Sequence, residues 1–76
     1  MQKEIIKTCE SMGKTIRNLR RSQGITQAQL AGLSNTGIRF ISDLENGKET
    51  CRFDKILQVL STLGVEIVIL DPYNKE

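Results

Sequence analysis

The stretch ITQAQLAGLSNTGIRFISDLENG, residues 25–47, decides the fold of this chain. Near its start stand Thr26 and, three residues later, Gln29, the pattern of a capping box that satisfies free backbone N–H groups at a helix start. Ile25 and Leu30 stand where a hydrophobic staple would hold that start in place. The pattern predicts a short helix from Gln27 to Leu33.

A tight turn and a second short helix are expected next. In SNTG, residues 34–37, Asn35 suits the left-handed backbone conformation that such turns require. The following helix is expected to run from about Ile38 to Asn46 and to stop at Gly47.

The apolar residues of this second helix do not all lie on one face. Phe40, Ile41 and Leu44 can share a buried side, and we assign Phe40 to the core. Ile38 and Arg39 must then point outward, which indicates that their partner lies outside the domain.

Helical periodicity continues on both sides of this stretch. Before it, an apolar stripe is interrupted by Gly13, so the first helix is expected to begin near Ser11 and to end at Gly24. After it, Thr50 is expected to cap a fourth helix that ends at Gly64. The first stripe is Ile5, Cys9, Met12, Ile16 and Leu19, and the second is Phe53, Ile56, Leu57, Leu60 and Leu63.

The segment VEIVIL, residues 65–70, predicts a β-strand that has no partner elsewhere in the chain. Pairing with the same strand of a second copy would cover its edge and give a two-fold dimer. A strand tucked against its own domain, or an extended tail, remains the alternative. The predicted dimer interface is Val65, Ile67, Val68, Ile69 and Leu70.

Composition fits one small soluble domain of 76 residues, which is short for a self-sufficient core. There is no His, and Cys9 and Cys51 lack metal-ligand spacing, so we predict neither metal nor cofactor. We interpret the two cysteines as reduced thiols, although a disulfide is possible in principle. The absence of a signal-peptide pattern and of a long apolar run predicts a cytoplasmic protein that does not enter a membrane.

Charge is unevenly distributed along the chain. Five basic and no acidic residues stand between Glu10 and Asp43, whereas the remainder carries six basic and nine acidic residues. Such a division favours a surface that faces a polyanion, with an ordinary solvated helix face as the alternative. The five are Lys14, Arg17, Arg20, Arg21 and Arg39.

No set of residues suited to acid–base or nucleophilic catalysis is evident, so we predict that the chain is not an enzyme. Asp43 and Glu45 are two residues apart on a helix and do not face each other, and we interpret Glu45 as structural. Two short helices around a tight turn, followed by a core helix, instead outline a helix-turn-helix. The second of these helices has the dimensions to enter the major groove of DNA, and the first would lie across the phosphate backbone.

The stretch TQAQLAGLSNTGIRFISDLENGK also resembles the lambda-repressor-like helix-turn-helix, and more narrowly the Xre/HipB-like group of bacterial regulators and antitoxins. The resemblance covers about residues 11–64, and residues 51–70 resemble the HipB-like branch, in which a C-terminal strand pairs across the dimer. The matching residues are Thr26, Gln27, Leu30, Ala31, Ile41, Ser42, Glu45, Asn46 and Gly47.

The resemblance implies roles for individual residues. Leu30, Ala31, Ile41, Leu44 and Leu60 match the family's core, and Gln27 and Asn46 match phosphate contacts. Together with the charge pattern, this predicts base contacts from Gly37, Ile38, Arg39 and Ser42. Contacts to the DNA backbone are predicted from Thr26, Gln27, Asn46, Lys14, Arg17, Lys48 and Arg52.

The recognition helix departs from the family in its contact chemistry. Where relatives often carry a hydrogen-bonding residue, Ile38 can only touch a thymine methyl group. Arg39 is the residue of this face able to grip O6 and N7 of guanine, and a phosphate contact or a salt bridge to Asp43 is its alternative role.

We therefore predict an all-α, lambda-repressor-like helix-turn-helix bundle of four to five helices with a C-terminal β-strand that pairs across a homodimer. Residues 1–10 would be an N-terminal extension or frayed helix, 11–64 the DNA-binding domain, 65–70 the dimerising strand and 71–76 a tail. The predicted function is sequence-specific repression of transcription at a palindromic operator on the bacterial nucleoid, with autoregulation and a HipA-like kinase toxin partner implied by the resemblance. The alternative is a protein-interaction module that neutralises a partner protein without binding DNA.

Overall fold

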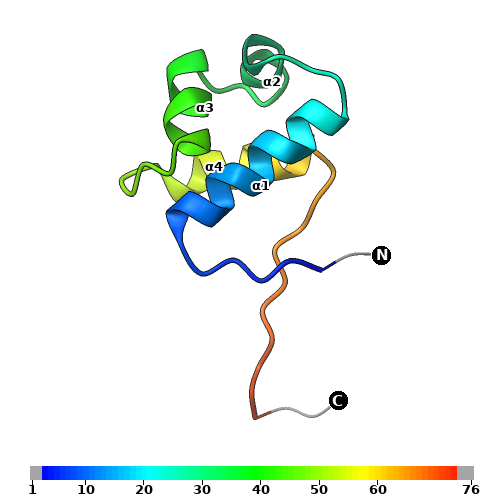
Figure 1. The fold of residues 1–76 in the computed structure, drawn as a ribbon, viewed down its shortest axis with the longest axis vertical. Coiled ribbons are helices and arrows are strands. Elements are labelled where there is room, and N and C mark those ends of the chain that lie inside the picture. Colours follow the sequence, from blue (N-terminus) through cyan, green and yellow to red (C-terminus); the bar gives the residue numbers. More distant parts are fainter. Residues whose placement is uncertain (1–2, 74–76) are drawn as a thin grey trace.

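The computed structural model describes residues 3–73, and four helices form its body (Figure 1). They are α1 (Cys9–Ser22), α2 (Gln27–Leu33), α3 (Ile38–Glu45) and α4 (Phe53–Thr62). The short helices α2 and α3 lie at one end of the body, and α1 and α4 cross beneath them (Figure 1). This arrangement is the all-α helix-turn-helix bundle that the sequence predicts.

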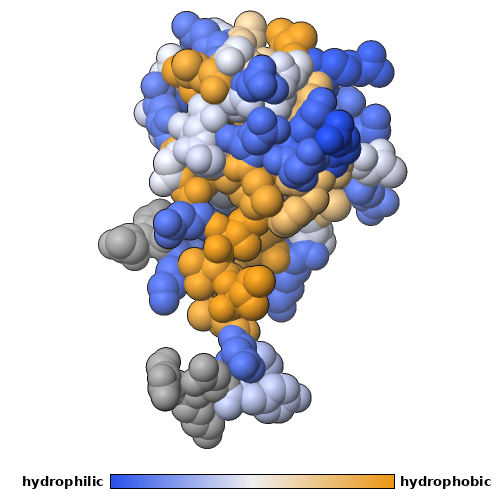
Figure 2. All heavy atoms as spheres, turned by 180° about the vertical axis from the view of Figure 1, so that it is seen from behind, coloured by the Kyte–Doolittle hydropathy of each residue, from blue (hydrophilic) through white to orange (hydrophobic). Residues whose placement is uncertain are grey.

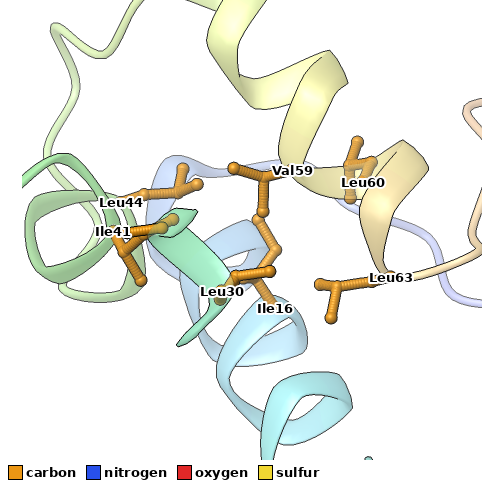
Figure 3. Packing of buried hydrophobic residues seen from close by; sticks show 8 residues of the cluster. Ile16, Leu30, Ile41, Leu44, Val59, Leu60 and Leu63 are labelled. Carbon is orange, nitrogen blue, oxygen red and sulfur yellow. The ribbon is translucent and has the colours of Figure 1, made fainter. Parts of the chain in front are cut away.

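Each helix supplies one side chain that is completely buried in the core: Ile16 from α1, Leu30 from α2, Ile41 from α3 and Val59 from α4 (Figure 3). Ala31, Leu44, Leu60 and Leu63 are buried around them, and Phe40 packs half-buried against the cluster. Removing a side chain of this size from water stabilises a fold by about 1.5–3 kcal/mol. The predicted core residues of α2 and α3 are confirmed.

The local signals around α2 are also confirmed. Its bounds are those predicted, and Thr26 and Gln29 form the reciprocal capping box, with Gln29 N donating to Thr26 Oγ1 at 3.1 Å and Thr26 N donating to Gln29 Oε1 at 2.8 Å. Asn35 takes the left-handed conformation at φ 57°, and α3 ends at Glu45 before Gly47 at φ 81°.

The first helix begins two residues earlier than the prediction near Ser11. Thr8 caps it in a box with Ser11, whose N–H donates to Thr8 Oγ1 at 3.0 Å. Gly13 lies inside the helix, at the point where α1 crosses the end of α3. A glycine is needed there because a Cβ would meet the carbonyl oxygens of Leu44 and Glu45, the latter at 2.6 Å. The glycine marks close helix packing rather than a helix boundary.

Two predictions for α4 are wrong. Thr50 does not cap it; Arg52 is the N-cap residue and makes no side-chain cap bond. Phe53 and Leu57 are exposed, whereas Val59, which the predicted stripe omitted, is buried. The face turned to the core follows the spacing of residues 56, 59, 60 and 63, which leaves Phe53 and Leu57 at its edge.

Residues 65–70 leave the helical body as extended chain and form no strand within the described part of this single chain (Figure 1). The predicted strand pairing needs a second chain, so it stays a prediction. Ile5 is exposed because the segment before Thr8 is not helical. Cys9, the first residue of α1, is exposed as well, so the part of the first apolar stripe that packs against the core begins at Met12.

Candidate nucleic-acid interface

The turn between α2 and α3 is held by its own side chains. Ser34 Oγ donates to Leu30 O at 2.7 Å and shares a 2.9 Å hydrogen bond with Thr36 Oγ1, while Thr36 N donates to Ala31 O at 2.9 Å. Because these bonds and the left-handed Asn35 set the turn, the start of α3 is presented at a defined angle to α2.

The beginning of α3 is exposed. Its N-cap residue Gly37 carries no side chain, Ile38 is 55% exposed, and the side chain of Arg39 is 90% exposed. Ser42, one turn after Ile38, is half-buried. The opposite face holds Ile41 in the core, so α3 is fixed on one side and free on the other.

The end of α3 is organised around a buried carboxylate. The side chain of Glu45 is 0% exposed and accepts from Arg20 at 2.6 Å (Nε to Oε2) and 3.0 Å (Nη2 to Oε1). Arg17 Nε donates to Oε1 at 3.3 Å and Gln27 Nε2 donates to Oε1 at 3.1 Å. We call Glu45 with Arg17, Arg20 and Gln27 the Glu45 cluster; it ties α1, α2 and α3 together.

The charges in this cluster stabilise one another. Burial alone raises the pKa of Glu45, but hydrogen bonds from Arg20, Gln27 and Arg17, with the Coulomb attraction of Arg20, outweigh it and lower the pKa below its ordinary value. The hydrogen bond to Glu45 raises the pKa of Arg20, against a smaller effect of burial. Both groups therefore stay ionised as a pair.

The Glu45 cluster brings together three predicted contacts to the DNA backbone. Gln27 and Arg17 bind Glu45 directly, and Arg17 Nη2 donates to Asn46 Oδ1 at 3.1 Å. The charge pattern places Arg20 among the cations of a polyanion-facing surface, and sequence reasoning misses that it is buried against Glu45. The signal was present, since Arg20 lies four residues after Ile16 and so shares its buried face.

A second carboxylate, Asp43, lies on the exposed side of α3. Its Oδ2 is 3.4 Å from Lys48 Nζ and 3.8 Å from Arg39 Nε. We call Asp43 with Arg39 and Lys48 the Asp43 cluster. The salt bridge that the sequence offered as an alternative role for Arg39 is thus present.

The remaining predicted backbone contacts are more scattered. Thr26 is exposed at the start of α2, where its hydroxyl caps the helix, and Lys14 is exposed on α1. Arg52 pairs with Asp54, at 2.6 Å from Nη2 to Oδ2, so its guanidinium is already engaged.

Metal-ligating groups, helix hydrophobicity and cysteines complete the description of residues 3–73. They contain no group of three metal-ligating His, Cys, Asp or Glu side chains, and none of their helices is long and apolar enough to cross a bilayer. Cys9 is exposed and Cys51 half-buried, and both are free thiols; burial raises the pKa of Cys51.

Comparison with known proteins places this geometry in a family. A family model described as helix-turn-helix matches residues 16–70. The chain is 49% identical over 67 residues to the "Uncharacterized HTH-type transcriptional regulator y4mF" of Sinorhizobium fredii, a match that covers 88% of both chains. The chain therefore belongs to the helix-turn-helix family of transcriptional regulators.

Solved structures give the same fold. A chain of the "HipA-HipB-O2-O3 complex" superposes with a TM-score of 0.83 at 20% identity, covering 92% of this chain and 99% of that one. The restriction-modification controller protein C.AhdI from Aeromonas hydrophila gives a TM-score of 0.70 at 28% identity, covering 76% of this chain and 84% of its own. The fold is that of the Xre/HipB-like regulators which the sequence resembles.

Proposed function

We propose that this chain is a sequence-specific double-stranded DNA-binding repressor of transcription, and that the exposed start of α3 enters the major groove. The observation that carries the proposal is the difference between the two sides of α3. Ile41 locks one side into the core, while Arg39 stands 90% exposed on the other beside a solvent-facing Ile38. An apolar side chain and a cation exposed together suit a groove that offers both methyl groups and acceptors.

In this proposal, Arg39, Ile38, Ser42 and the backbone at Gly37 face base edges. Arg39 would donate to O6 and N7 of guanine, and Ile38 would contact a thymine methyl group.

The Glu45 cluster would support the phosphate contacts. Gln27 and Arg17 are held at the junction of the three helices that meet at Glu45. Because Oδ1 of Asn46 accepts from Arg17, the amide NH2 of Asn46 is left to donate to a phosphate oxygen. Thr26, Lys14 and Lys48 complete the proposed contacts to the backbone, and Arg52 joins them by exchanging its exposed partner Asp54 for a phosphate.

Binding to short duplexes tests the proposal. DNA selected from a random pool by the wild-type chain should share a consensus, and log affinity for it should fall linearly with log salt. Arg39→Ala should weaken binding to that consensus by about 5- to 150-fold, the value of one good bidentate contact. Arg21→Ala, which removes an exposed cation of α1 outside the proposed contacts, is the matched control. Unchanged affinity and base preference in Arg39→Ala would refute the role of Arg39.

We also propose a homodimer formed through residues 65–70. Val68, Ile69 and Leu70 are exposed, and Figure 2 shows hydrophobic side chains as a column below the helical body, where this segment lies. An extended segment with such apolar side chains, which forms no strand within the described part of the single chain, favours pairing with a second copy. Two recognition helices would then read half-sites about 34 Å apart on a palindromic operator.

The oligomeric state tests this pairing. Proline in a paired strand removes a ladder hydrogen bond, and alternate residues make those bonds, so Ile67→Pro and Val68→Pro together cover both registers. At least one should yield monomers in light scattering, whereas Val68→Thr, which keeps the β-branch, should not. A dimeric mass in both proline variants would contradict the strand-pairing interface.

Finally, we propose that the repressor is the autoregulating antitoxin of a HipA-like kinase toxin. The support is its fold, which is that of a chain in a structure described as a HipA-HipB-O2-O3 complex. Co-expression with the product of the adjacent gene should give a stable complex that still retards the shared upstream DNA. A complex that forms while the chain alone never retards that DNA at low salt would favour the pure protein-interaction module instead.

A further inference from the structure

An acidic residue on the exposed face of α3 requires a reason. Asp43 lies four residues after Arg39, one helical turn further along the same face. A carboxylate on a surface that approaches DNA is repelled by the phosphates and weakens binding. Its side chain is 28% exposed, so its charge is not hidden in the core.

The contacts of Asp43 indicate what it does. Arg39 approaches Asp43 Oδ2 through Nε, at 3.8 Å. An approach through Nε leaves both terminal Nη groups of Arg39 available to donate. These two groups can together donate a parallel pair of hydrogen bonds to O6 and N7 of guanine.

Lys48 limits the repulsion between Asp43 and the DNA phosphates. Its Nζ is 3.4 Å from the same Oδ2, and its backbone N–H donates to Asp43 O at 3.0 Å. The cation is therefore held beside the carboxylate by the backbone of the segment that follows α3. Asp43 can orient Arg39 with its charge partly balanced.

We propose that Asp43 is a specificity-determining residue: it orients Arg39 toward a guanine in the major groove of the operator half-site. This inference rests on the proposed function and deepens it, since it names a G·C base pair as the feature read by the Arg39–Asp43 pair. An unrestrained arginine side chain can also turn to a phosphate, which carries no sequence information. At 3.8 Å the carboxylate lies within ion-pairing distance of Nε without a hydrogen bond, and its charge biases the exposed guanidinium toward this side of α3 rather than toward a phosphate.

The experiment is selection of duplexes from a random pool, followed by affinity measurements on the consensus and on duplexes with the guanine replaced. Wild type, Asp43→Asn, Arg39→Ala and the double variant are compared. Asp43→Asn should reduce the preference for guanine by about tenfold, within the range of one bidentate base contact. Its affinity for unrelated DNA should stay equal or rise, because one negative charge has been removed.

The double variant shows whether Asp43 acts by orienting Arg39 or has only a structural role. In the Arg39→Ala background, Asp43→Asn should cause no further loss of guanine preference. Asp43→Glu, which keeps a carboxylate, should retain part of that preference. Lys48→Ala is the control, since it removes the other cation of Oδ2 and should weaken binding to all sequences alike.

Each outcome decides between the proposals. If wild type selects a consensus and Asp43→Asn keeps the same base preferences, the role of Asp43 is refuted while the repressor function stands. A loss in Asp43→Asn that adds to the loss in Arg39→Ala refutes it as well. If wild type enriches no sequence at all, the proposed function fails and this inference fails with it.

Discussion

Two carboxylates on the same helix, Glu45 and Asp43, each pair with two cations but differ in burial and therefore in what they contribute. Glu45 is fully buried and bonds to Arg17 and Arg20 from another helix. Asp43 is partly exposed and meets Arg39, one turn earlier, and Lys48, in the following segment.

The two clusters differ in their exposure to water. A buried charge without a partner is very unfavourable, so the Glu45 cluster holds only when it is complete and makes one arrangement of α1, α2 and α3 favourable. An exposed pair adds little to stability, because water and salt screen it, and the donors that it leaves unused stay available to a ligand. Burial thus separates a structural ion pair from one available for recognition.

The largest expected effect comes from opening the Glu45 cluster. Glu45→Gln removes the negative charge and leaves Arg20, which is buried, without an ionic partner. Breaking a buried pair in this way costs about 3–5 kcal/mol, to be measured as a lower midpoint of urea unfolding. Arg20→Met combined with Glu45→Met should recover part of the loss, because no buried charge is then unpaired. A midpoint equal to that of wild type would show that the cluster is not structural.

A smaller loss is expected from the helix contact beside this cluster. Gly13→Ala would place a Cβ 2.6 Å from Glu45 O, so α1 must shift away from α3. We expect destabilisation of about 1–3 kcal/mol, although alanine is the better helix former. In the matched control Gly32→Ala, nothing lies within 4 Å of the added Cβ, and thermal unfolding should show equal or higher stability. Equal effects of the two substitutions would refute the close contact.

Acid should weaken the Glu45 cluster. The folded chain lowers the pKa of Glu45 below the value of about 4.3 expected in the unfolded chain. Its contribution is therefore present above about pH 4.3 and is lost as the pH falls through the lowered pKa. Unfolding midpoints between about pH 6 and 3 should fall more steeply for wild type than for Glu45→Gln.

Asp54 provides the control for this pH dependence. The hydrogen bond from Arg52 lowers the pKa of Asp54, so its titration acts in the same direction. This pair is exposed, however, and Asp54→Asn should leave most of the acid dependence in place. If Asp54→Asn rather than Glu45→Gln removed the dependence of the unfolding midpoint on pH, the acid sensitivity would arise from the exposed Arg52–Asp54 pair and not from the Glu45 cluster.

The smallest effect on stability is expected at Asp43. Asp43→Asn removes two exposed ion pairs and should change the free energy of unfolding by less than about 1 kcal/mol. Unfolding in urea at low and high salt measures this difference, which should shrink further at high salt. A loss as large as that of Glu45→Gln would make Asp43 structural and remove the contrast between the two clusters.

The sequence was most informative where its signals are local. The capping box at Thr26 and Gln29, the turn at Asn35 and the stop at Gly47 predicted the helix-turn-helix because each acts within a few residues. The expected start of α1 failed because the reason for Gly13 lies in another helix. The buried face of α4 was predicted incorrectly because its apolar residues fit more than one helical face. Only packing against the other helices selects the face that contains Val59.

The sequence by itself therefore determined the order of the helices, the turn between α2 and α3, most of the core, and the presence of Ile38 and Arg39 on an outward face. Tertiary structure alone decided how charges pair over long separations. It buried Arg20 against Glu45, 25 residues away, and brought Gln27 and Arg17 to the same carboxylate. Local propensity acts over one or two turns, whereas the partners of a buried charge are set by which helices meet.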